Sequence, residues 1–266
     1  MTNESSREWP RLRWRAGEAP SAGERTLALE APVALVHDGS TTAVLMASPA
    51  DLEDLAVGFS LSEGIVAKAE EIAEIEVVTV EAGIEARMWL AVDRSAELAA
   101  RRRHMAGPTG CGLCGVESLE AAMRPGAAIA DAATRVAASD LLAAMAALEA
   151  AQAVGRATRA VHAAALWSPG EPLLTREDVG RHNALDKLIG AAARSGRTGR
   201  ALLLTSRVSV EMVQKACVLG APVVCAVSAP TALAVRTAEA AGLTLVAVAR
   251  ADGFEVFAHP DRVLTE

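Results

Sequence analysis

From residue 136 onward, short apolar segments alternate with segments of helical periodicity, a pattern that few folds accommodate. Short connections between such segments favour a mainly parallel sheet with helices on both faces. Ligands of such sheets bind at the carboxyl ends of the strands, and polar residues follow three expected strands, at 206–207, 228–231 and 250. Strands are expected over 160–167, 201–205, 222–227, 243–249 and 254–258, and helices over 141–153, 183–194, 210–219 and 231–241.

The first hundred residues predict a smaller α/β unit. Apolar segments around 34–36 and 42–46 flank His37-Asp38-Gly39, which is a hairpin signal, and a helix is expected after Asp51. Further strands are expected over 75–82 and 84–92. The chain is therefore expected to divide into a polar N-terminal tail over 1–25, a small α/β domain over 26–100, a basic glycine-rich loop over 101–125 and a larger α/β domain over 126–266.

Composition excludes several classes of protein. With 52% hydrophobic and 3% aromatic residues, the chain is neither disordered nor an aromatic-rich β-sandwich. A net charge of -7 argues against a nucleic-acid partner, because binding to phosphates needs a basic excess. The longest uncharged run, 216–235, is interrupted by Gly220, Pro222 and Pro230, so no membrane insertion is expected. Without a signal peptide pattern, and with only four cysteines, the protein is expected in the cytoplasm with reduced thiols.

The sharpest local motif is Gly110-Cys111-Gly112-Leu113-Cys114-Gly115. Two thiols at this spacing can share a metal, form a disulfide or carry a sulfur atom, and the basic run 101–104 nearby favours the thiolate. A zinc site would need two more ligands, whereas Cys217 and Cys225 lie in apolar segments typical of core. From the residues alone, metal and sulfur chemistry both stay open.

Polar residues also gather at three turns from strand to helix. A helix N-terminus bearing Arg181 and His182 can hold an anion, although a capped helix start with ion pairs is the alternative. Taken together, the three turns indicate a phosphate-bearing ligand. Arg250 follows the strand expected over 243–249, either as a solvated residue or as a phosphate or guanine contact. His162 lies in an apolar strand, which is typical of a core histidine.

Four motifs, with the segment 46–65, resemble the FdhD family, sulfur carrier proteins required for formate dehydrogenase activity. The similarity runs from about Pro32 to Val263. The motifs are the glycine-flanked cysteine pair, Glu177-Asp178-Val179-Gly180-Arg181-His182-Asn183-Ala184, Ser228-Ala229-Pro230-Thr231 and Thr244-Leu245-Val246.

The resemblance implies a sulfurtransferase. The family takes sulfur from a cysteine desulfurase as a cysteine persulfide and passes it to molybdenum bis(molybdopterin guanine dinucleotide) before this cofactor enters formate dehydrogenase. Cys111 matches the persulfide cysteine and Cys114 its partner thiol. The family is a homodimer whose C-terminal domain is a cytidine-deaminase-like three-layer α/β/α domain without deaminase chemistry. No histidine here starts the H-x-E pattern of zinc deaminases, and no bound metal is expected.

The resemblance also implies where the cofactor binds. By alignment, the guanine nucleotide site includes Val248, Ala249, Arg250, Ala251, Asp252 and Gly253, while the polar turns add Arg181, His182, Arg207, Ser228 and Thr231. The sequence departs from the family pattern at Arg159-Ala160, where Gly-Gly is common, and at Thr205-Ser206, where Ser-Gly is common. A chaperone that only holds the cofactor, and a structural zinc protein, are the alternative functions.

Overall fold

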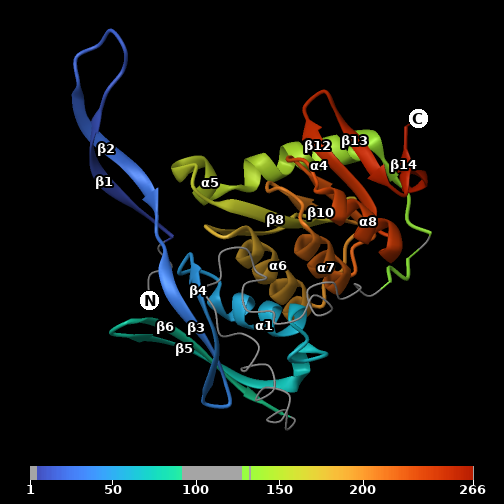
Figure 1. Cartoon of the computed structure of the whole chain (residues 1–266), viewed down its shortest axis with the longest axis horizontal. Helices are drawn as coiled ribbons and strands as arrows, with labels where there is room; N and C mark the ends of the chain where they lie inside the picture. The colour runs from blue at the N-terminus through green and yellow to red at the C-terminus, as the bar shows by residue number, and fades with distance from the viewer. Residues whose placement is uncertain (1–4, 92–127, 132, 266) are drawn as a thin grey trace.

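The structure is a computed structural model that describes residues 5–91, 128–131 and 133–265. It has a six-stranded sheet, a four-stranded sheet and two small two-stranded sheets, as Figure 1 shows. The α/β fold class predicted from the sequence is confirmed. The cysteine pair at 111 and 114 and most of the expected glycine-rich loop lie outside the described residues.

The six-stranded sheet is mixed, so the expectation of a mainly parallel sheet is wrong. Only the three neighbours β10, β11 and β12 run parallel. The outer strands pair antiparallel because β8 and β9, like β12 and β13, follow each other through short reversing connections. In spatial order the strands are β13 (Gly253–Ala258), β12 (Thr244–Arg250), β11 (Val223–Ala226), β10 (Ala201–Leu204), β8 (His162–Trp167) and β9 (Leu174–Asp178).

Helices cover both faces of this sheet, as predicted. Alternate residues of a strand point to opposite faces, so Leu203 of β10 packs in one apolar cluster and Leu202 in the other. The first face carries α4 (Ala138–Ala151), which is followed by the short α5 (Ala153–Thr158). The second face carries α6 (Arg181–Ser195), α7 (Val210–Leu219) and α8 (Ala232–Ala241). The likeness to cytidine deaminases stays a prediction.

The N-terminal sheet confirms the expected hairpin and helix. Its spatial order is β4 (Ser40–Ala47), β3 (Ala31–His37), β6 (Gly83–Leu90) and β5 (Ile72–Val80). One face packs against α1 (Leu52–Ser62) around an apolar cluster that includes Leu35, Leu55 and Met88. The remaining elements are η1 (Ala69–Glu71), η2 (Pro260–Arg262) and the parallel pair β7 (Val136–Ala137) and β14 (Val263–Leu264).

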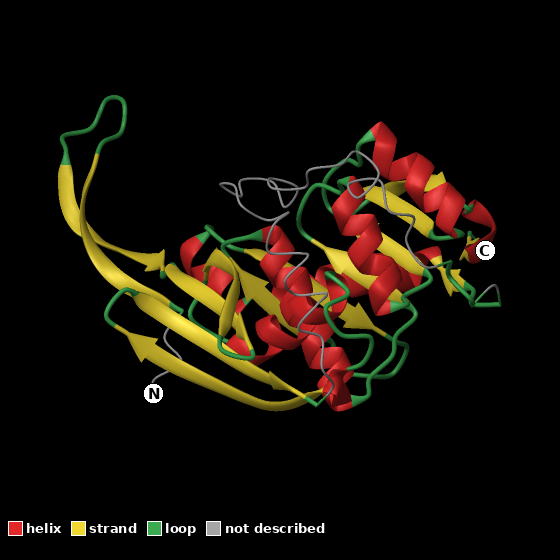
Figure 2. Ribbon diagram, turned by 60° about the horizontal axis from the view of Figure 1, so that its bottom comes forward, coloured by secondary structure: helices red, strands yellow, loops and turns green. Residues whose placement is uncertain are grey.

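The segment expected as a polar N-terminal tail holds regular structure, because residues 6–28 form an antiparallel hairpin of β1 (Ser6–Arg13) and β2 (Ser21–Ala28). Residues 5–28, which we call the arm, project from the body in Figures 1 and 2. The polar composition suggested a tail, but a ribbon exposed on both faces needs few apolar residues. The predicted boundary at residue 25 falls within β2, which leads almost directly into β3.

Helix α1 crosses α6 at two glycines. A Cβ atom on Gly58 would lie 1.7 Å from the backbone oxygen of Asp186, and one on Gly190 would lie 1.9 Å from that of Asp54. The two backbones therefore touch at a distance that only glycine permits. The crossing fixes the N-terminal sheet, through α1, against the helix layer of the larger sheet.

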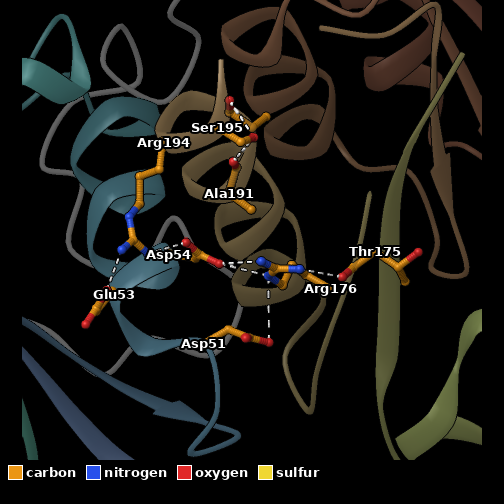
Figure 3. Close-up of polar contacts among 9 residues, drawn as sticks. Asp51, Glu53, Asp54, Thr175, Arg176, Ala191, Arg194 and Ser195 are labelled. Carbon is orange, nitrogen blue, oxygen red and sulfur yellow. Dashed lines mark hydrogen bonds and ion pairs between the residues drawn. The ribbon is translucent and has the colours of Figure 1, made fainter. Parts of the chain in front are cut away.

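Ion pairs flank the crossing, as Figure 3 shows. The nearly buried carboxylate of Asp54 in α1 accepts from Arg176 Nη2 of β9 at 2.7 Å and from Arg194 Nη1 of α6 at 2.6 Å. Arg194 also pairs with Glu53, and Arg176 with Asp51 at 3.7 Å. One helix is thus tied to a strand and a helix that lie more than a hundred residues later.

A second cluster is fully buried. Lys187 of α6 is 0% exposed, and its Nζ lies 2.6 Å from Oδ2 of the equally buried Asp178, at the end of β9. Ser48, which follows β4, forms hydrogen bonds with both members of this pair. Its backbone N–H donates to Asp178 Oδ2 at 3.0 Å, its backbone oxygen accepts from Lys187 Nζ at 2.9 Å, and its Oγ accepts from the backbone N–H of Val179 at 3.1 Å.

Replacing Lys187 by Met leaves the Asp178 carboxylate buried without its cation. We expect the free energy of unfolding to fall by about 3–5 kcal/mol, against about 0–1 kcal/mol for Arg15→Met in the exposed pair Arg15–Glu18. Denaturant unfolding measures both variants, and Lys187→Met with Asp178→Asn should recover part of the loss. A Lys187→Met cost equal to that of Arg15→Met contradicts this.

Gly190→Ala places a methyl group on the backbone of α1. Because neither helix can yield without moving the crossing, we expect a loss of at least about 2 kcal/mol. Gly23→Ala in β2 is the matched control, since its Cβ would meet only Arg11 Nη2 at 3.9 Å, and its effect should stay within about 0.5 kcal/mol. Equal thermal midpoints for the two variants would show that the crossing is not tight.

Candidate functional site

One edge of the six-stranded sheet collects the predicted polar turns. The parallel strands β10, β11 and β12 all end there. Because β8 is antiparallel to β10, and β9 to β8, this edge also receives the start of β8 at His162 and the end of β9 at Asp178. We call it the carboxyl edge. The segments that bear the predicted residues Arg181, His182, Arg207, Ser228, Thr231 and Arg250 all leave or reach the sheet here.

Backbone hydrogen bonds join two of these turns. The N–H of Thr231 donates to the oxygen of Val208 at 2.9 Å, and the N–H of Val208 donates to the oxygen of Ala229 at 3.4 Å. Thr231 caps α8, since its Oγ1 accepts from the N–H of Ala234 at 3.2 Å. Arg207 and Ser228 therefore sit on turns that are fixed to one another, whereas the hydroxyl of Thr231 already serves as a helix cap.

The end of β12 is distorted at the predicted guanine segment. Val248 has a φ of 54°, which is a rare conformation for a β-branched residue, and the register with β13 shifts between Ala247 and Arg250. Such strain costs about 1–3 kcal/mol and clusters at ligand sites. Arg250 Nη1 donates to the oxygens of Val227 and of Ala249, so its guanidinium braces the distorted backbone. The buried Ala249 packs in the core.

Most of the polar motif at 177–187 is structural. Asp178 Oδ1 accepts from the N–H of Gly180 at 2.8 Å and from Asn183 Nδ2 at 3.1 Å, which shapes the entry to α6. The carboxylate of Glu177 accepts from the N–H groups of Val154 and Gly155, at the start of α5. The alternative interpretation, a capped helix start with ion pairs, therefore accounts for these residues.

Arg181 and His182 are the two members of the motif that point to a ligand. Arg181 Nε and His182 Nε2 are buried and have no hydrogen-bond partner within the described residues. The same holds for Ser209 Oγ and Glu211 Oε2 at the start of α7. A buried polar atom without a partner costs free energy, and a ligand that supplied the partner would recover it. Four such atoms near the starts of two helices mark this part of the carboxyl edge as the candidate site.

His182 is uncharged at neutral pH. Burial, and then the positive charges of Arg181 and Lys215, lower its pKa to about 4. Burial and Arg181 also lower the pKa of His162. At this site histidine therefore offers a hydrogen bond and no positive charge, so that Arg181 and Arg207 supply the charge that an anion would meet.

Helix α6, which bears Arg181 and His182, is held in place by a lysine of α7. Lys215 Nζ of α7 donates to Asp186 Oδ1 and Oδ2 at 2.8 and 2.9 Å, and to Ser62 Oγ at the end of α1 at 2.7 Å. Although burial opposes the charge on Lys215, the carboxylates of Asp186 and Glu63 outweigh it and raise its pKa. Lys215 therefore stays charged and holds α1, α6 and α7 together beneath the site.

The cysteines of the described residues are inert. Cys217 in α7 and Cys225 in β11 are buried, as the apolar pattern predicted, and burial raises their pKa values to about 11 and about 12. A thiol must ionise to act as a nucleophile, so neither can act near neutral pH. Among the described residues, no three His, Cys, Asp or Glu side chains are placed to bind a metal ion, and no helix is long and apolar enough to span a membrane.

Two local features explain what sequence reasoning noted or missed. Arg159, one of the two positions noted in the sequence at 159–160, ends α5 in the left-handed conformation with a φ of 59°, which glycine adopts more readily. Ser48 was missed because its role arises from contacts with residues about 130 positions later. Lys187 is buried in α6 together with Asn183 and Asp186, and polar residues within the apolar periodicity of this helix were the available signal for buried partners.

Comparison with known proteins gives a consistent result. The model of the FdhD/NarQ family matches residues 28–264. A sulfur carrier protein FdhD of Agrobacterium fabrum is 52% identical over 92% of each chain, and one of Cupriavidus necator is 51% identical over 96% of this chain and 88% of the relative. A crystal structure described as a formate dehydrogenase accessory protein, from Desulfotalea psychrophila, superimposes with a TM-score of 0.74 at 25% identity, over 98% of this chain and all of the other. With a family match over most of its length and relatives at half identity, the chain belongs to the FdhD/NarQ family.

Proposed function

We propose that this protein is a sulfurtransferase that carries sulfur on Cys111 and delivers it to molybdenum bis(molybdopterin guanine dinucleotide) for formate dehydrogenase. The identity of 52% to a sulfur carrier protein FdhD carries the proposal. The carboxyl edge supports it, because Arg181 and Arg207 provide the charge that a large phosphate-bearing substrate requires.

The distribution of the four cysteines supports the choice of thiol. Cys217 and Cys225 are buried with raised pKa values, which leaves Cys111 and Cys114 as the candidates for a reactive thiolate. The Cys111 thiolate attacks the outer sulfur of a persulfide on a cysteine desulfurase. The sulfur–sulfur bond of the donor breaks, the donor cysteine leaves as a thiolate, and Cys111 carries the persulfide.

Delivery must account for two electrons. The outer sulfur of a persulfide becomes sulfide only when its bond to Cys111 breaks with the electron pair. Attack of the Cys114 thiolate on the Cys111 sulfur supplies that pair, forms a Cys111–Cys114 disulfide and releases hydrosulfide. This resolving role is one of three for Cys114; relay of the sulfur and support of the loop are the others.

The substrate would bind along the carboxyl edge. Its phosphates would meet Arg181 and Arg207, and His182, being neutral, would donate a hydrogen bond. The guanine would lie against the distorted end of β12 and the turn into β13, residues 248–253, near Ser228. We expect a cysteine desulfurase and the catalytic subunit of formate dehydrogenase as partners, a homodimer, and a cytoplasmic location.

Incubation with a cysteine desulfurase and cysteine should add one sulfur atom to the chain, and a reductant should remove it. Cys111→Ala should abolish the gain, whereas Cys217→Ala, the matched control, should keep it because that thiol is buried and un-ionised. Intact mass measures the gain.

Intact mass, metal analysis and formate dehydrogenase activity together separate the alternative functions. A chaperone that only holds the cofactor would gain no sulfur and would support formate dehydrogenase without Cys111. A structural zinc protein would purify with bound zinc, which metal analysis would detect. Full formate dehydrogenase activity with Cys111→Ala would refute the carrier role.

Arg181→Gln should weaken the binding of guanosine diphosphate, used as a probe for the nucleotide end of the substrate, by at least about tenfold through loss of a charged contact. Arg197→Gln is the matched control, since Arg197 pairs with Glu171 on the surface. Calorimetric titration measures both dissociation constants. Equal affinities for the two variants would place the phosphates elsewhere.

A further inference from the structure

The arm has one basic face and one acidic face. Residues paired across an antiparallel ribbon share a face, and alternate residues of a strand point to opposite faces. The register pairs Arg7 with Leu27 and Trp9 with Arg25. All arginines of the two strands therefore fall on one side, which we call the arginine face: Arg7, Trp9, Arg11, Arg13, Arg25 and Leu27. Both glutamates, Glu8 and Glu24, lie on the opposite face.

The arm offers this face to solvent. Trp9 is 55% exposed, although tryptophan and arginine are the residues that most often dominate protein interfaces. The Leu29 N–H donates to the Ser5 oxygen at 2.8 Å and closes the base of the hairpin. Of the arginine face, Arg25 alone is shown bonded to the chain's own body within the described residues, where its Nη2 donates to the Thr158 oxygen of α5 at 3.3 Å. A two-stranded ribbon is marginally stable by itself, so an arm of this length gains stability from a partner.

The same chain carries a surface of complementary character. Helix α1 covers one face of the four-stranded sheet, and the other face bears several exposed side chains. We call this second surface the outer sheet face. It includes Val44 and Met46, which are 55% and 51% exposed, and Trp89, which is 39% exposed. Acidic side chains lie among them: Glu74 pairs with Trp89 across the strands, and Glu76 and Glu85 flank Arg87.

The charges favour a partner like the body of this chain. Residues 5–28 contain five Arg and three Glu, a net charge of +2, whereas the whole chain carries -7, so the remaining residues carry -9. A nucleic acid or an anionic membrane would attract the arm but would repel the body. An acidic, partly apolar protein surface satisfies both the arginines and Trp9.

We propose that the arm of one copy lies across the outer sheet face of a second copy, with its arginines opposite Glu74 and Glu76 and Trp9 over Val44 and Met46. Because β2 leads into β3 through two residues and the arm points away from its own body, the surface it covers belongs to another chain. If each copy gives one arm and receives one, the exchange closes with two-fold symmetry.

The arm is long enough for this contact. A strand of eight residues spans about 26 Å at roughly 3.3 Å per residue, whereas four strands about 4.8 Å apart span about 14 Å. The inference adds surfaces to the homodimer of the proposed function. It does not depend on sulfur transfer, because assembly and sulfur loading are measured separately.

Charge reversal tests the proposal by sedimentation equilibrium of the full chain. Arg11→Glu with Arg13→Glu is the arm variant, and Glu74→Lys with Glu76→Lys is the sheet variant. Each should weaken self-association at least tenfold, because like charges then face each other. A mixture of the two variants should restore it, since both contacts of the mixed dimer pair opposite charges. Leu12→Ser, on the acidic face of the arm, should leave association unchanged.

Several results would overturn the proposal. A full chain that stays monomeric at micromolar concentration would do so. So would a dimer whose affinity neither variant alters, or a mixture that does not reassociate. A monomer whose arginine face instead binds a DNA duplex or phosphatidylserine vesicles would assign the arm to another partner. Unchanged thermal unfolding of each variant monomer would show that the body remains folded.

Discussion

The structure depends on the buried ion pair of Asp178 and Lys187. In the interior, an unpaired charge costs several kcal/mol, so this pair persists only while Ser48 completes its hydrogen bonds. Ser48 directly follows β4 of the N-terminal sheet, and Asp178 precedes the turn to Arg181 and His182. One desolvated contact thereby joins the two parts of the chain and sets the entry of α6. The glycine crossing of α1 and α6 makes that junction rigid.

That junction explains why unsatisfied atoms are tolerated at the carboxyl edge. Arg181 and His182 start a helix in which Asn183, Asp186 and Lys187 bond to Met46, Lys215 and Ser48 respectively. Because the backbone is held on several sides, their buried nitrogens are left without a partner among the described residues. The strained Val248 at the end of β12, on the same carboxyl edge, is a second local feature typical of a ligand site. Preorganised donors of this kind suit a large anionic substrate.

Periodicity in the sequence predicted most helices and strands of the larger unit, because each buries an apolar face. It could not predict that the sheet is mixed, since β9 has the polar sequence Leu-Thr-Arg-Glu-Asp and its burial comes from α1 and α6. The arm was missed because its strands bury almost nothing. At the site, Arg181 and His182 could be singled out from composition, whereas the roles of Ser48, Gly58 and Gly190 arise from long-range contacts that no local pattern records.

In the proposed function, sulfur passes through this chain to the molybdenum cofactor that formate dehydrogenase uses. The most direct test is to load the chain with radioactive sulfur from labelled cysteine by means of a cysteine desulfurase. The loaded chain is then allowed a single turnover with molybdenum bis(molybdopterin guanine dinucleotide) and the formate dehydrogenase apoprotein. The account predicts that label leaves the Cys111 peptide and appears in the cofactor of the active enzyme in equal amount. Formate dehydrogenase that becomes active while the label stays on the carrier would contradict it.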